Sequence, residues 1–253
     1  PERPTGELRA SGKNLAWQDQ LALETLSLEA DLQEGLRLVS RLQAESLEGF
    51  GQELETLTLE ANGTQGEHVV SIRASHAEAD LELAFAGGAG TDWKTWRGEL
   101  SRGVIDLPEQ AKQWQLSSPA TLAYEANGEL TFGNHCWRWQ QSTVCAEDQT
   151  LLPVPRIAYR IDRFPTVALA PLLPETLRWD GRINGEIDFT TTGDGPDGRV
   201  FLDAGEGQFQ LLVDGEWESL TYNTLTTEVG LKPNQADLAV RLSGPSLAIL
   251  PWI

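Results

Sequence analysis

The sequence predicts an all-β chain, and three features support that prediction. Segments in which apolar and polar residues alternate recur along most of the chain, as expected of half-buried strands. Turn signals such as Asn62-Gly63 and Asn127-Gly128 separate these segments. No long amphipathic helical pattern is available to cover the apolar sides of the strands. The chain is therefore expected to consist of β-meanders.

The first predicted strands lie in a short segment that occurs twice in the sequence. The segment "LETLSLEAD" at 23–31 recurs as "LETLTLEAN" at 54–62. On its own the first copy is ambiguous, because the spacing of Leu23 and Leu26 fits a helix, whereas the residues from Leu26 to Leu32 alternate as in a strand. The second copy continues into "HVVSIRAS" at 68–75, where β-branched residues alternate with polar ones. We therefore expect strands in both copies.

Further strands are predicted along the remainder of the chain, at 80–87, 121–133, 181–215 and 236–244. The exception is the segment 162–181, where Pro165, Pro171 and Pro174 exclude a long helix or a central strand. We expect one short helix near 165–173. The predicted organisation is a β segment at 1–155, a Pro-rich connection at 156–177 and a second β segment at 178–253.

The pattern leaves the arrangement of layers open. Strands with one apolar and one polar face must bury the apolar face in some way. The sheet could fold onto itself as a sandwich, close as a barrel, or curl and leave an apolar groove. The alternation of residues does not distinguish among these three.

The charge balance disfavours two classes of partner. The chain has 38 acidic and 19 basic residues, a formal net charge of −19. Such a surface repels the phosphates of nucleic acids and of anionic membranes. No segment approaches the length of a membrane-spanning helix, and the first residues do not resemble a signal peptide. Because the sequence contains no Met and ends in the apolar "ILPWI", we expect it to be a piece of a longer protein.

Neither an enzyme nor a metal site is expected. The histidines, His68, His76 and His135, lie in no recognisable catalytic motif. The turn "GDGPDG" at 193–198 lacks the ligand spacing of a calcium loop. His135 and Cys136 are adjacent on a predicted strand, so they would point to opposite faces and could not share a zinc ion. No cofactor is expected.

The two cysteines are expected to form a disulfide. Cys136 and Cys145 lie symmetrically about the Gln140–Gln141 bond in "GNHCWRWQQSTVC". A hairpin turning there would place them opposite each other, at a separation that a disulfide can bridge. Two free buried cysteines are the alternative. A disulfide would indicate an oxidising compartment.

Four segments together resemble the TamB family of the AsmA-like bridge proteins. They are "WRGELSRGVIDLP" (96–108), "HCWR…C" (135–145), "FPTVALAPLLPETLRWDGRINGEIDF" (164–189) and "GRVFLDAGEGQFQL" (198–211). The resemblance implies an elongated, curled, mostly single-layer sheet with an apolar concave face. It also implies a periplasmic location, an inner-membrane anchor, and an outer-membrane assembly partner (TamA-like) engaged by parts outside this segment.

The resemblance implies a non-enzymatic function in which an apolar trough shields phospholipid acyl chains between the two membranes. A chaperone-like scaffold that pairs with unfolded outer-membrane strands, and a closed structural sandwich, are the alternatives. Apolar positions of the alternating segments are the candidate lining of the trough. They are Leu57, Leu59, Val70, Ile72, Leu81, Leu83, Phe85, Leu122, Tyr124, Leu130, Phe132, Ile187, Phe189, Phe209 and Leu211.

Overall fold

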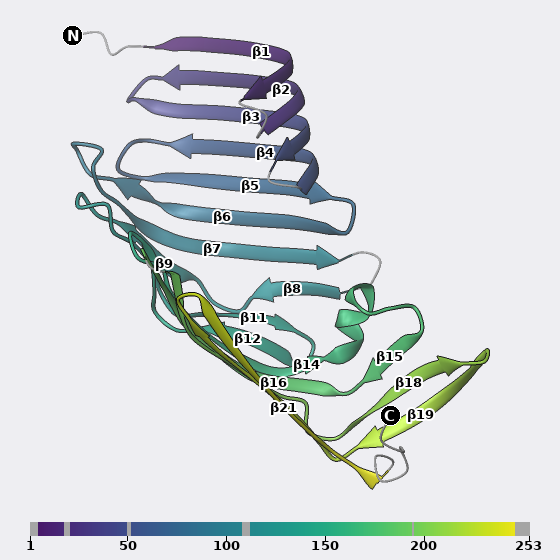
Figure 1. The fold of residues 1–253 in the computed structure, drawn as a ribbon. Coiled ribbons are helices and arrows are strands. Elements are labelled where there is room, and N and C mark those ends of the chain that lie inside the picture. The colour runs from purple at the N-terminus through teal and green to yellow at the C-terminus, as the bar shows by residue number, and fades with distance from the viewer. Residues whose placement is uncertain (1–4, 18–20, 50–51, 108–111, 194, 246–253) are drawn as a thin grey trace. The chain divides into compact units, whose positions relative to one another are not determined.

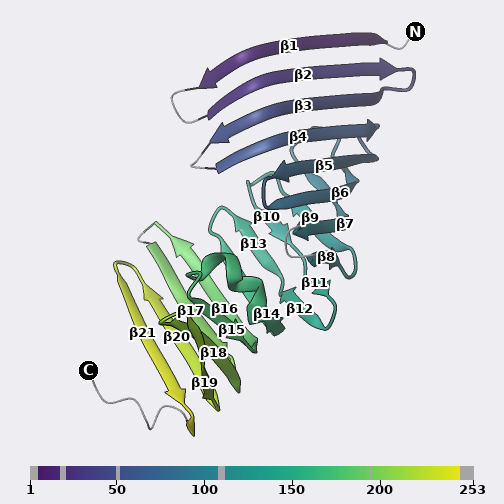
Figure 2. The ribbon, with the colours of Figure 1, turned by 90° about the vertical axis from the view of Figure 1, so that its right-hand side faces the viewer.

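The computed structural model describes residues 5–17, 21–49, 52–107, 112–193 and 195–245. It divides into two compact units, Pro1–His135 and Cys136–Ile253, here called unit 1 and unit 2. Both units consist almost entirely of antiparallel strands (Figures 1 and 2). The all-β prediction is confirmed.

Unit 1 is a meander in which successive long strands pair with their neighbours (Figure 1). After β7, β8 and β9 pair with opposite halves of that strand, and β10 pairs with β9. The strands are β1 (Gly6–Trp17), β2 (Leu21–Gln33), β3 (Arg37–Gly49), β4 (Gln52–Gly63), β5 (His68–His76), β6 (Ala79–Ala89), β7 (Trp96–Leu107), β8 (Lys112–Leu116), β9 (Ala120–Tyr124) and β10 (Leu130–Phe132).

The first strands of unit 1 bend sharply near one end, as Figure 1 shows for β1 to β4. Asn14 in β1 and Ser46 in β3 adopt a left-handed backbone, each with φ of 51°. A residue of this kind shifts the alternation of side chains by one position, as in a β-bulge. Leu23 pairs with Leu47 on one side of the bend, and Leu26 pairs with Ala44 on the other. The spacing of Leu23 and Leu26, which fits a helix, is therefore the spacing across a bend in a strand.

The apolar face of unit 1 is the inside of this bend. A β-carbon added to Gly12 would lie 2.8 Å from Leu15 Cδ1, so side chains three residues apart converge on that side. Side chains on the outside of a bend diverge. Leu15 belongs to the same face as Leu23, Leu47 and Leu54, with which it is aligned across four strands. The predicted apolar concave face is confirmed here.

The outer face of unit 1 carries a ladder of alternating charges. Arg41, Glu60, Arg73, Glu82 and Arg102 lie on five successive strands, with nitrogen–oxygen distances of 3.5, 3.0, 3.3 and 2.9 Å between neighbours. Hydrogen bonding to Glu60, and then to Glu82, raises the pKa of Arg73 above its ordinary value. Such exposed pairs contribute little stability each, and the ladder keeps this face polar.

Most strands of unit 2 are also arranged antiparallel, and they are called the large sheet of unit 2 below (Figure 2). Strand β14 pairs with β12, β13 and β16, and β17, β20 and β21 follow in order from β16. Its elements are β11 (His135–Trp139), β12 (Ser142–Ala146), β13 (Gln149–Leu152), β14 (Arg156–Pro165), β16 (Arg182–Thr192), β17 (Gly195–Asp203), β20 (Thr224–Lys232) and β21 (Gln235–Ser243).

A smaller three-stranded sheet lies in the same unit. Strand β18 (Gly207–Val213) pairs with β15 (Leu177–Asp180) on one side and with β19 (Glu216–Tyr222) on the other. The 3₁₀ helix η2 (Thr166–Leu172) follows β14 and contacts β15. This helix confirms the one predicted near 165–173.

The small sheet is fixed to the large one by a compact core. Ile183, Ala204 and Tyr222 are buried at its centre, and the partly buried residues around them include Trp179 and Phe209. The indole of Trp179 donates a hydrogen bond to Tyr222 Oη at 2.7 Å. A β-carbon on Gly207 would lie 2.2 Å from that oxygen, so only glycine allows Tyr222 to approach so closely.

The structure answers the question of layers. In unit 1 the described strands form a single curled layer. Each strand in it contacts mainly the strands to which it is hydrogen-bonded. In unit 2 a second layer covers only the end of the large sheet near Tyr222. A closed sandwich is thus not the fold. The predicted boundaries at 1–155, 156–177 and 178–253 stay a prediction.

Candidate functional site

The apolar face of unit 1 is built from rows of side chains that run across the strands. Residues paired between strands lie on the same face, so the register defines each row. The central row is Ala10, Leu28, Leu42, Leu59, Ile72, Leu83 and Gly103. The next row along the strands is Leu8, Ala30, Ser40, Ala61, Val70, Phe85, Leu100 and Ala120. Apart from Ser40, both rows are apolar.

Most of these side chains are only half-buried. Leu59, Ile72 and Leu83 retain partial exposure although they occupy the centre of the sheet. Leu8, at one end of its row, is 55% exposed. A continuous apolar surface of this kind, left uncovered by the protein's own described strands, indicates a binding surface.

The eleven candidate positions in unit 1 all share this face. Leu57, Leu59, Val70, Ile72, Leu81, Leu83 and Phe85 belong to its rows directly. Leu122 pairs with Gly98 of β7 and with Phe132 of β10, which extends the face. Tyr124 pairs with Trp96 and with Leu130 at the margin of the face. The structure therefore brings these positions together, and their contact with lipid stays a prediction.

Trp96 and His68 complete this margin, although the sequence did not single them out as lining residues. Trp96 Nε1 donates to His68 Nε2 at 2.8 Å, and His68 Nδ1 lies 2.9 Å from the carbonyl oxygen of Thr64. Because an indole nitrogen only donates and a carbonyl oxygen only accepts, the imidazole of His68 accepts at Nε2 and donates from Nδ1. β-Carbons on Gly87 and Gly98 would lie 2.6 and 2.5 Å from the Trp96 ring. The indole therefore packs directly against the two glycines, in space that a side chain would fill.

Ile187 and Phe189 lie on a second apolar face, on the large sheet of unit 2. Ile187 is aligned with Tyr159 and Val200, and Phe189 with Ile157. The row through Ile187 continues to Val229 and to Leu238 of β21, which is 68% exposed. The face bends at Arg163, whose φ is 51°, so that Ile161 and Phe164 point to the same side.

Phe209 and Leu211 lie on the small sheet instead. The ring of Phe209 is 5.5 Å from Trp179 and 5.2 Å from Tyr222, within the core that joins the two sheets. Leu211 is two residues further along β18, on the same side of the strand, and is 42% exposed. The small sheet thus turns an apolar side toward the apolar face of the large sheet. Leu211 extends that side beyond the core.

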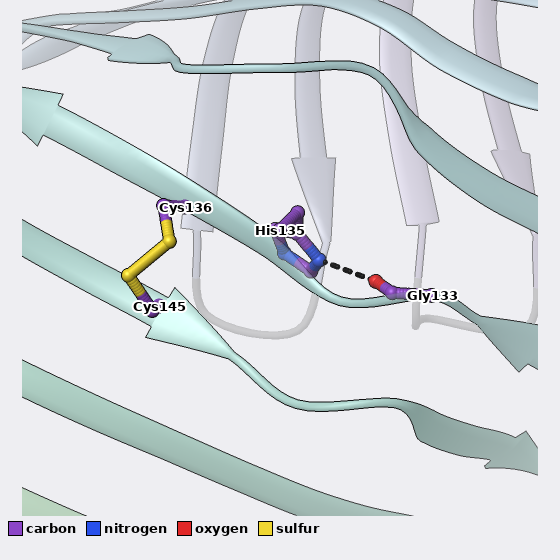
Figure 3. Close-up of a disulfide and its surroundings, with 4 residues drawn as sticks. All are labelled: Gly133, His135, Cys136 and Cys145. Atoms are coloured by element: carbon purple, nitrogen blue, oxygen red, sulfur yellow. Dashed lines mark hydrogen bonds between the residues drawn. A yellow bond between two sulfur atoms is a disulfide. The ribbon is translucent and has the colours of Figure 1, made fainter.

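The predicted disulfide is present. Cys136 and Cys145 are bonded, with their Cα atoms 4.0 Å apart (Figure 3). The hairpin turns at Gln140, which has φ of 51°, as the symmetry of the sequence predicted. Cys145 is aligned with Arg160 and Glu186, so the bond lies on the outer face of unit 2. By alternation, Trp137 and Trp139 point to the apolar face.

His135 has a structural role beside this hairpin. It is buried, and its Nδ1 donates to the carbonyl oxygen of Gly133 at 2.9 Å (Figure 3). Its ring lies 4.2 Å from that of Phe132. Within the described part of the chain, no group of three or more His, Cys, Asp or Glu side chains is placed to hold a metal ion. Among the same residues, no helix is long and apolar enough to cross a membrane.

The geometry defines a class of protein: an antiparallel sheet, curled and open, whose concave face is apolar and whose outer face is polar. The family model described as TamB, N-terminal domain, matches residues 1–246. The chain belongs to the TamB family. This is a periplasmic, membrane-anchored family with a non-enzymatic function in transport and assembly. No solved structure matches the chain significantly.

Proposed function

We propose that this chain is a periplasmic segment of a lipid-conducting bridge whose apolar faces shield phospholipid acyl chains in transit between the inner and outer membranes. The observation that carries the proposal is the continuous, half-buried apolar face of unit 1, in which all the predicted lining residues of that unit share one side of the sheet. The disulfide is in keeping with an oxidising compartment.

An apolar face suffices for such a function. Removing an acyl chain from water is favourable by about 0.8 kcal/mol per methylene, or on the order of 10 kcal/mol for a whole chain. An open face covers only part of the chain, so binding is weaker than this and the lipid can move on. A catalytic group or a specific polar site is not required.

The test is a charge placed on the apolar face. Leu59→Glu puts a carboxylate in the central row of unit 1, where passing acyl chains would have to desolvate it. We expect transfer of phosphatidylethanolamine between donor and acceptor vesicles to fall at least tenfold. Leu83 lies in the same row, on the far side of Ile72 from Leu59. Leu83→Glu is therefore expected to behave in the same way.

The matched control is Thr58→Glu, which places the same charge one residue away on the outer face, beside Arg73. This variant is expected to transfer lipid normally. Circular dichroism of both variants checks that the sheet is retained. Normal transfer by a folded Leu59→Glu protein would rule out the apolar face as the lipid path.

A second candidate, a scaffold that accepts strands of outer-membrane proteins, is favoured by β21. Its apolar side chains Leu238, Val240 and Leu242 are 68, 56 and 40% exposed. Among the described strands β21 pairs only with β20, which leaves its other edge open to strand addition. Asp237→Pro would remove an amide from this strand. A loss of client-protein binding without a loss of lipid transfer would support the scaffold.

A further inference from the structure

The two margins of the apolar face of unit 1 differ in chemistry, and we infer from this difference which way a bound phospholipid points. One margin is formed by the bent strand ends near Leu54, here called the bent margin. The other is formed by the turns after β4 and β6 and by Tyr124, here called the aromatic margin. We propose that the glycerol and headgroup lie over the aromatic margin, with the acyl chains extending toward the bent margin. This rests on the proposed function.

The aromatic margin has the side chains that favour a boundary between apolar and polar surroundings. Trp96 and Tyr124 are paired across β7 and β9 at the end of the apolar rows, and Tyr124 is 40% exposed. Trp93, in the turn between β6 and β7, is 69% exposed. Trp and Tyr concentrate at the headgroup level of membranes because their rings are apolar and their NH and OH groups are polar.

The turns at this margin are held in place. The backbone N–H of Ala89 donates to the carbonyl oxygen of Gln65 at 2.8 Å, which joins the turn after β4 to the turn after β6. The Gln65 side chain also donates to the carbonyl oxygen of Gly90. Trp96 is fixed by His68 and by the flat surface of Gly87 and Gly98. The Trp96 ring is thus pre-positioned.

The charges at the two margins also differ. The aromatic margin mixes the two signs: the cations Arg37, Lys94 and Arg97 lie there with the carboxylates Glu67, Asp92 and Glu125, and Arg97 pairs with Glu125 at 2.9 Å. The bent margin carries five exposed carboxylates on adjacent strands: Glu24, Glu45, Glu48, Glu53 and Glu55. Hydroxyl groups of Thr25 and Ser46 donate hydrogen bonds to the carboxylates of Glu45 and Glu24.

Charges interact over ~8 Å at physiological ionic strength, so a phosphodiester brought to the bent margin would meet the field of these carboxylates. Five carboxylates would repel it. The bend also brings the Leu15 side chain close to Gly12 on the apolar face, which adds apolar surface for acyl chains on this side. Electrostatics and shape therefore favour the same orientation.

The experiment is site-specific photo-crosslinking of the chain with vesicles of phosphatidylethanolamine and phosphatidylglycerol, followed by mass spectrometry of the adducts. Benzoylphenylalanine replaces Tyr124 at the aromatic margin, Leu59 at the centre, and Leu54 at the bent margin. We expect adducts on the glycerol or headgroup from position 124, and adducts on the acyl chains from positions 59 and 54. The ratio of headgroup to acyl adducts should differ at least fivefold between positions 124 and 54.

Headgroup adducts from position 54, or equal ratios at 54 and 124, would overturn the orientation and leave lipid binding itself intact. Adducts from none of the three positions would overturn both the orientation and the proposed function. The charge argument has its own variant, Glu48→Lys/Glu53→Lys, which should raise headgroup adducts at position 54 several-fold. Glu29→Lys, a single charge reversal of the same kind at mid-strand on the outer face, should leave the ratio unchanged. No rise in the double variant would contradict the electrostatic part.

Discussion

In each unit a second apolar surface, here called a wall, lies opposite part of the apolar face of the sheet, and the two units form this wall in different ways. Unit 1 bends its own strands at left-handed residues such as Ser46, so that one continuous sheet supplies both walls. Unit 2 bends at Arg163 and then adds a separate sheet of β15, β18 and β19, fixed by a core around Tyr222. The first solution depends on backbone conformation and the second on side-chain packing. The same function should therefore be sensitive to different substitutions in each unit.

The largest effect is expected at the core of unit 2. Tyr222→Ala removes a side chain that is only 1% exposed, together with the acceptor for Trp179. We expect a loss of about 3–5 kcal/mol in the free energy of unfolding of unit 2, as for other buried aromatics. Hydrogen exchange should show loss of protection in β18 and β19 and unchanged protection in β2 to β6. An equal loss of protection in both units would contradict the view that the core around Tyr222 fixes only the small sheet of unit 2.

The disulfide should rank second. In Cys136→Ser/Cys145→Ser the unfolded chain is no longer restricted by the short loop that the bond closes. On the chain-entropy model this costs about 2.5–3 kcal/mol in the free energy of unfolding, measured by urea denaturation. Adding reductant to the native chain is the matching treatment, and it should not lower the stability of the double variant further. An unchanged denaturation midpoint in the double variant would show that the bond adds nothing to unit 2.

The bend of unit 1 should be sensitive to the backbone. Ser46→Val places a β-branched residue at φ of 51° and should cost about 1–2 kcal/mol in the free energy of unfolding. Ser46→Gly is the control, because it loses the same hydroxyl group but tolerates the same φ. Chemical denaturation of the two variants isolates the backbone contribution. If valine and glycine gave equal stability, the left-handed residue would not be what holds the bend.

The smallest effect is expected on the outer face. Glu60→Gln breaks the ion pairs with Arg41 and Arg73, which are both exposed. The expected loss is about 0.5 kcal/mol at low salt, and it should shrink as salt is added. Glu99→Gln, on the same face but outside the ladder, should show no such salt dependence. A loss of several kcal/mol would mean that the ladder, rather than the bend, organises unit 1.

Sequence alone predicted that the chain is built of strands, and it predicted the apolar side of those with clear alternation. It also placed the turn at Gln140 and hence the disulfide. It did not predict the bend, since a left-handed residue at Ser46 has no distinctive sequence and its one-position shift resembles helical spacing. The small sheet was also missed as a layer. Its strands alternate like the others, and only the packing of Tyr222 separates them.

The lining was predicted best where strands are regular. Positions such as Leu59 and Phe85 share the apolar face because the meander keeps its register. Phe209 belongs to the core that joins the two sheets, and nothing in its local pattern distinguishes it from Ile187. Trp96 escaped prediction because its place depends on Gly87, from a neighbouring strand, and on His68, which is distant in sequence.

The central claim is that lipid contacts the apolar faces of both units and not the outer faces. Photo-crosslinking in the periplasm from adjacent positions tests it most directly: Phe85 against Ala84 in unit 1, and Ile187 against Glu186 in unit 2. Each pair places the probe on opposite sides of one strand. We predict phospholipid adducts from positions 85 and 187 and none from 84 and 186. Equal adducts from both members of a pair, or adducts only with unfolded client proteins, would contradict the claim.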